Sequence, residues 1–246
     1  MPESVGGRYS VSSSVAVAVA LVFGLDALHE VRDGMRLIDE HFVQAPLDVN
    51  LPVVHGLIGW WNATVLGYAS AAVIPYSRAL HVLPAYLQQL MMESNGKSVD
   101  VNGVSVARTS PVVWGGVGTN AQHAFFQLLH QGTQVVPCDF IGCSAALGSS
   151  QADHDVLVAN MLAQSQALAF GVARDEVDGP ATLQAHRATP GNRVIAAVFS
   201  GDKEHPGPCA LIQPIFICFM AELTIAFVDL TGSVSVFETL GNDRAT

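Results

Sequence analysis

The chain has 246 residues, of which 50% are hydrophobic and 13% charged, and its formal net charge at pH 7 is -10. This length supports one large or two small domains whose core needs neither disulfides nor a metal, and the negative charge argues against a nucleic-acid partner. The four cysteines form no Cys-x-x-Cys pair and no His stands at a zinc-finger spacing from them, so we expect reduced core thiols.

Mean hydropathy is +0.38, which is high for a soluble chain and raises the question of a membrane segment. The stretches concerned are Val15–Leu25, Pro52–Ile74 and Cys209–Leu230. The first is too short to span a bilayer and follows a polar run rather than a basic one, which argues against a signal peptide. Polar residues and prolines interrupt the other two. We therefore expect all three to be buried core, with no membrane association.

The first predicted element is an amphipathic helix over residues 26–43. Apolar side chains recur there at spacings of three and four, at Leu28, Val31, Met35, Ile38 and Phe42. Polar side chains fall on the other faces of the same helix, at Asp33, Arg36, Asp39 and Glu40.

Short apolar runs then alternate with helical patterns. We expect strands at 71–74, 112–114, 135–140 and 194–199, and helices at 79–94, 120–131 and 154–170. Pro84 requires the first of these helices either to begin near Leu83 or to be kinked.

This alternation predicts an α/β fold, a doubly wound parallel sheet with helices on both faces. We place that domain at residues 46–230. Residues 1–45 are then a helical remnant of a preceding domain, and residues 231–246 form an atypical tail.

Ligands of such sheets bind beyond the carboxyl ends of the strands, so the loops there are the first place to look for chemistry. Residues 115–120 form a glycine-rich turn that could present backbone N–H groups to an anion, although it is neither a Walker A loop nor a dinucleotide fingerprint. His123 is predicted in the first turn of the next helix, where the macrodipole disfavours a positive ring and a neutral imidazole could transfer protons. Taken alone, such a histidine is more often structural.

Glu93 ends the helix that Asn95 and Gly96 terminate, beside Met91 and Met92. Apolar neighbours and a helix carboxyl end suit a general base that works near neutral pH. A glutamate at a helix end is nevertheless usually a solvated surface charge, and spacing alone cannot join Glu93 to His123.

Several short runs occur in a characteristic order along residues 3–199: Val5-Gly6-Gly7-Arg8-Tyr9-Ser10, Met92-Glu93-Ser94-Asn95-Gly96-Lys97, Gly118-Thr119-Asn120, Gln122-His123-Ala124-Phe125, His130-Gln131-Gly132-Thr133, Pro137-Cys138-Asp139-Phe140, Ala159-Asn160 and Pro190-Gly191-Asn192-Arg193. Together they resemble the C-terminal half of the glucose-6-phosphate isomerase (phosphoglucose isomerase) family. The resemblance implies sugar-isomerase (SIS-type) α/β domains and a cytoplasmic homodimer that works without cofactor or metal. It further implies interconversion of glucose 6-phosphate and fructose 6-phosphate, in glycolysis and gluconeogenesis, through an enediol.

The resemblance also implies roles for individual residues. Glu93 matches the base that shuttles the proton between C1 and C2, and His123 matches a histidine that assists ring opening from the partner subunit. Arg8 matches the cation beside the enediol, where it can stabilise developing negative charge. Gly7 and Gln89 match substrate contacts. We expect Gln89 and Glu93 to project towards the carboxyl ends of the strands, with the 115–120 loop alongside.

The chain also departs from the family pattern. A family glutamate is absent from the 115–118 turn, and after Phe199 the likeness ends, so that the family's C-terminal lysine has no match. The family's N-terminal half, which holds the substrate phosphate, is not represented either. A truncated, non-catalytic module that binds sugar phosphate or dimerises is therefore the alternative to an isomerase.

Overall fold

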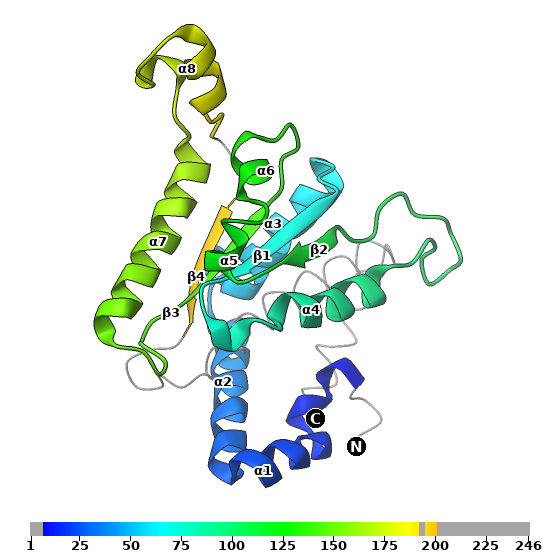
Figure 1. Ribbon diagram of the computed structural model, residues 1–246. Coiled ribbons are helices and arrows are strands. Elements are labelled where there is room, and N and C mark those ends of the chain that lie inside the picture. The colour runs from blue at the N-terminus through cyan, green and yellow to red at the C-terminus, as the bar shows by residue number, and fades with distance from the viewer. Residues whose placement is uncertain (1–6, 192–194, 201–246) are drawn as a thin grey trace.

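A computed structural model describes residues 7–191 and 195–200 of the chain, and its centre is a parallel sheet (Figure 1). The strands are β1 (Ser70–Pro75), β2 (Val112–Gly115), β3 (Cys138–Cys143) and β4 (Ile195–Ser200), in the order β2-β1-β3-β4. Strand β3 begins three residues later than predicted. Pro137, just before it, has no N–H to donate to a ladder, although its carbonyl accepts from Ala72 N at 2.8 Å.

Strand β1 lies between β2 and β3 and divides the core into two layers. Ala72 and Ile74 point into one hydrophobic cluster and Val73 into the other, as the period of two requires. Both faces of the sheet are thus covered by helices, which confirms the predicted doubly wound α/β class.

One face is covered by the segment that follows β1. It consists of η4 (Arg78–Leu80), α4 (Leu83–Leu87) and the π-helix η5 (Gln88–Glu93). Pro84 lies in the first turn of α4, where a missing N–H costs nothing, so of the two possibilities the helix begins at Leu83.

The other face carries α5 (Gly118–Ala121), α6 (Phe126–Gln131) and α7 (Gln151–Phe170). The prediction of one continuous helix over 120–131 is wrong, because a turn separates α5 from α6. Phe125 has φ -142° at that turn, and its ring packs edge-on against Trp114 with centroids 4.7 Å apart. The short η6 (Arg174–Glu176) and α8 (Ala181–Arg187) extend beyond the end of α7 (Figure 1).

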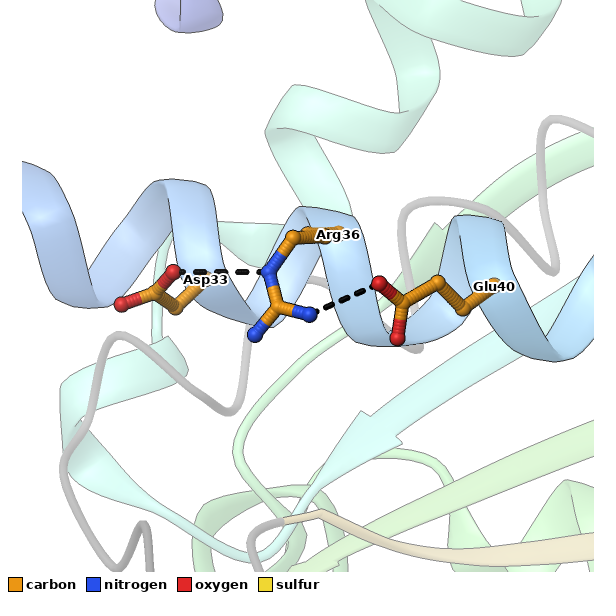
Figure 2. A network of polar contacts seen from close by, with 3 residues as sticks. All are labelled: Asp33, Arg36 and Glu40. Atoms are coloured by element: carbon orange, nitrogen blue, oxygen red, sulfur yellow. Dashed lines mark hydrogen bonds and ion pairs between the residues drawn. The ribbon is translucent and has the colours of Figure 1, made fainter.

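The amino-terminal part consists of η1 (Gly7–Ser12), η2 (Ser14–Ala16), α1 (Val17–Phe23) and α2 (Leu25–Gln44), followed by α3 (Leu51–Trp60) and the π-helix η3 (Trp61–Val65). Helix α2 matches the predicted amphipathic helix closely. Ile38 is buried on its inner face, and on an outer face Arg36 donates to Glu40 at 2.7 Å and lies 3.7 Å from Asp33 (Figure 2). The Glu40 carboxylate, followed by that of Asp33, raises the pKa of Arg36.

The prediction that Val15–Leu25 is buried core is wrong. Helix α1 projects with α2 away from the sheet (Figure 1), and Leu21, Val22 and Phe23 are 81, 71 and 72% exposed. In Pro52–Ile74 the strand portion is buried, whereas Leu57, Ile58 and Trp61 on the preceding helices are exposed. The third stretch, Cys209–Leu230, and the tail 231–246 lie outside the described residues.

No helix among the described residues is long and apolar enough to cross a bilayer. Cys138 and Cys143 are buried in the core, as predicted, while Cys209 and Cys218 lie outside the described residues.

Candidate active site

Two of the predicted substrate contacts meet at one cavity. A hollow of about 300 Å³ lies where η1 and η2 pack near the α4–η5 segment, and both Gly7 and Gln89 line it together with Ser10 and Tyr86. Arg8 follows Gly7 in η1, but its side chain lies outside the described part of the structure. The fold thus brings the start of the chain against the helix that carries Gln89.

Glu93 is exposed four residues beyond Gln89, at the end of η5. Its backbone carbonyl accepts a hydrogen bond from Lys97 Nζ at 2.7 Å. The π-helical geometry of this segment is uncommon, and π-turns occur frequently at functional sites.

Two hydrogen bonds that no sequence pattern predicted anchor η5 to the sheet. Gln88 Nε2 donates to Val113 O at 3.0 Å, and Val113 N donates to Met92 Sδ at 3.4 Å. These bonds pair the N–H and C=O groups of Val113 on β2, a strand at one edge of the sheet, and so hold η5 against it.

The position of Glu93 beside the 115–120 loop stays a prediction. A helix that follows a parallel strand runs back towards the amino ends, and Met92 accordingly lies beside Val113 in the first half of β2. The 115–120 loop leaves from the other end of that strand. The end of η5 that bears Glu93 is thus held beside the first half of β2, whereas the turn that bears His123 follows the loop after β2.

His123 is exposed in the turn between α5 and α6, not in the first turn of a helix. Its backbone N donates to Asn120 O at 3.1 Å. His130, on α6, instead joins two helices, because its Nε2 lies 3.0 Å from Gln164 Oε1 on α7. His130 is thus structural, and His123 does not lie at the amino end of a helix, where a macrodipole would favour its neutral form.

Tyr76, which no sequence pattern singled out, supports the turn that bears His123. It follows β1, is 2% exposed, and accepts at its hydroxyl from Gln122 Nε2 at 3.1 Å. The same amide group donates to Asn160 Oδ1 on α7. Gly118 lies so close to the tyrosine ring that an added Cβ would overlap it. The only sequence signal was that Gln122 and Asn160 belong to the family-like runs.

We expect Tyr76→Phe to make stability less sensitive to alkaline pH. Burial raises the pKa of Tyr76 above its ordinary 10.0, and the hydrogen bond from Gln122 opposes this only in part. The folded state then keeps a proton that the unfolded state releases, so the free energy of unfolding falls as pH rises above 10.0.

Urea denaturation at neutral and at alkaline pH measures this slope in both proteins. At neutral pH the variant should lose about 1 kcal/mol with the hydrogen bond. A Phe variant with the same alkaline slope as the parent would contradict the assignment.

Among the residues that the structure describes, no group of three or more His, Cys, Asp or Glu side chains is placed to hold a metal ion.

The sequence model of phosphoglucose isomerase matches residues 1–224. A glucose-6-phosphate isomerase of Roseiflexus castenholzii is 50% identical over 193 residues, which cover 77% of this chain and 36% of that protein. A second, from Anaeromyxobacter dehalogenans, is 45% identical over 217 residues, which cover 86% of this chain and 39% of that protein. The chain therefore spans little more than a third of the length of these relatives.

The crystal structure of a glucose-6-phosphate isomerase from Chlamydia trachomatis gives a TM-score of 0.76 at 35% identity, covering 100% of this chain and 48% of that chain. Sequence and fold thus agree over most of the chain, which belongs to the phosphoglucose isomerase family.

Proposed function

We propose that this chain carries part of the active site of a glucose-6-phosphate isomerase. The reaction is the interconversion of glucose 6-phosphate and fructose 6-phosphate in glycolysis and gluconeogenesis. It needs no cofactor or metal, and we place it in the cytoplasm. The observation that carries the proposal is the cavity where Gly7 meets Gln89, four residues ahead of Glu93 on η5.

Glu93 is the proposed base. After ring opening, its carboxylate takes the proton from C2 of the aldose while O1 gains a proton, which gives the enediol. The carboxylic acid then delivers a proton to C1 while O2 loses its proton, which gives the ketose. The exposed Glu93 lies four residues beyond Gln89, which lines the cavity, and this proximity along η5 supports the assignment. We assign Gln89 and Gly7 to hold substrate hydroxyls, and Arg8 to stabilise the negative charge that develops as the enediol forms.

His123 is proposed to act on the site of a second copy of the chain. It is exposed, and its turn follows the loop after β2, whereas Glu93 follows Met92, which contacts the first half of that strand. A two-fold homodimer allows each His123 to reach its partner's cavity. The Tyr76–Gln122–Asn160 contacts support this role, because they fix the turn that presents the ring.

Subunit complementation tests the base and the dimer together. Glu93→Gln and His123→Ala chains are each inactive in this scheme, but a mixed dimer contains one site with both native residues. Unfolding the two variants together and refolding the equal mixture should recover about a quarter of the parent's isomerase rate, since half of the dimers are mixed and half of their sites are intact.

Each variant refolded alone is the control, and a coupled assay from fructose 6-phosphate measures the rate. A mixture no more active than the separate variants would rule out the shared site. A parent chain with no turnover that still binds sugar phosphate would favour the non-catalytic module instead.

A further inference from the structure

A second cavity, of about 440 Å³, lies at the amino ends of β1 and β2. Ala69 and Pro111, which line it, are the residues immediately before these two strands. The 115–120 loop, in contrast, leaves from the carboxyl end of β2. Met91 and Asn95 also line this cavity, so it lies along a different face of the η5 segment from Gln89, which lines the candidate substrate cavity.

The charges around this second cavity have one sign. Lys97 and Arg108 line it, and no Asp or Glu is among the lining residues. In a chain of net charge -10, two cations without a lining carboxylate form a local positive site. Such a concave site attracts anions.

Both cations are fixed by main-chain carbonyls rather than by carboxylates. Arg108 Nη1 donates to Gly67 O at 2.8 Å, and Lys97 Nζ donates to Glu93 O at 2.7 Å. Gly67 has φ +72°, and the guanidinium packs so close that a Cβ there would lie 3.4 Å from Nη2. A carbonyl neutralises no charge and uses only one donor, so each cation keeps further N–H groups for a ligand.

Neutral donors complete the lining. Thr64, Ser98 and Thr109, which carry hydroxyl groups, line the same cavity, and so does Ser110, whose hydroxyl donates to Pro111 O at 3.0 Å. A phosphate dianion needs several donors around its oxygens, and two cations match its charge. A single carboxylate would leave one of the two cations unpaired.

The backbone around the cavity is also unusual. Ala63 and Thr64 come from the π-helix η3, and Met91 comes from the π-helix η5. π-helical turns are rare and are found frequently at functional sites. Two π-helical segments on one cavity therefore support a binding role independently of its charge.

We propose that this cavity binds the phosphate group of a small phosphorylated metabolite, held between Lys97 and Arg108. The site is separate from the proposed isomerase cavity and does not depend on it. Lys97 also donates to the backbone carbonyl of Glu93, so a ligand bound to Lys97 is linked through this hydrogen bond to the end of η5, which bears the proposed base.

Titration with inorganic phosphate in a low-salt, phosphate-free buffer tests the proposal. In ¹⁵N-labelled chain, the indole N–H signal of Trp60, which lines the cavity, should shift on addition of phosphate, while that of Trp114 should not. Lys97→Gln and Arg108→Gln should each weaken binding about tenfold or more, since each removes one charged donor.

The matched control is Arg174→Gln, which removes an exposed cation far along the chain and should bind phosphate as the parent does. Gln89→Ala alters only the proposed isomerase cavity and should also leave phosphate affinity unchanged. Lys97→Arg keeps the charge and should retain most of the affinity, which shows that the fold survives changes at this position.

Unaltered phosphate affinity in both Lys97→Gln and Arg108→Gln would overturn the proposal. Phosphate binding that is lost in Gln89→Ala would also overturn it, because the anion would then occupy the isomerase cavity. Neither result bears on the complementation experiment, so the two proposals can fail separately.

Discussion

Replacing Glu93 with Gln should slow hydrogen exchange at C1 of fructose 6-phosphate by about a thousandfold, which corresponds to roughly 4 kcal/mol of transition-state stabilisation. The amide of glutamine has nearly the shape of the carboxylate but cannot take up the proton that moves between C1 and C2. The variant should therefore fold normally and bind sugar phosphate, but lose the proton transfer.

Proton NMR in D₂O measures this exchange, because each enediol that forms allows the C1 signal to be replaced by deuterium. Signals can be followed for hours, so the method detects turnover well below that of a full-length enzyme, which matters for a chain that spans 36% of one such relative. Glu30→Gln, an exposed glutamate on α2, is the matched control and should leave exchange unchanged. Normal exchange in Glu93→Gln would refute the proton-shuttle role.

Gly115→Ala should destabilise the fold by about 3 kcal/mol or more, from the combined cost of backbone strain and steric overlap. Gly115 ends β2 with φ +150°, a conformation that side-chain-bearing residues rarely adopt. It pairs with Val73 of β1, and an added Cβ would overlap the Val73 backbone. The backbone of a central strand cannot move aside, so the two strands would have to separate.

The adjacent glycine provides an internal control. Nothing lies within 4 Å of a Cβ added at Gly116, and its φ is not positive. Gly116→Ala should therefore change the free energy of unfolding by less than about 0.5 kcal/mol. Urea denaturation of both variants measures the free energy of unfolding. An equal loss of stability in the two variants would contradict the close approach of β1 and β2 at Gly115.

Local patterns predicted most elements well. The helix expected at 26–43 is Leu25–Gln44, and the helix expected at 154–170 is Gln151–Phe170. Ser150 caps the latter by accepting from Asp153 N at 3.1 Å, a short-range interaction that sets where the helix begins. These elements depend on side chains only a few positions apart, which is why sequence periodicity reveals them.

Predictions failed where distant residues decide the outcome. The break within 120–131 depends on Phe125 packing against Trp114, a residue of β2. The exposure of α1 depends on what lies beside it in space, because an apolar run has the same sequence pattern whether it is covered or not. In the first case a contact remote in sequence overrode the local pattern, and in the second no described element covers the exposed apolar side chains of α1.

By itself, the sequence determined the doubly wound α/β class, the family and the residues of interest, because periodicity and ordered motifs are written along the chain. Only the tertiary structure decided how those residues are grouped. It brought Gly7 and Gln89 to one cavity, and it placed the Tyr76 hydroxyl against Gln122, the residue before His123. The physical reason is that a helix between two parallel strands runs from the carboxyl end of one strand back to the amino end of the next. The distance between two side chains therefore follows from strand order and packing rather than from spacing in the sequence.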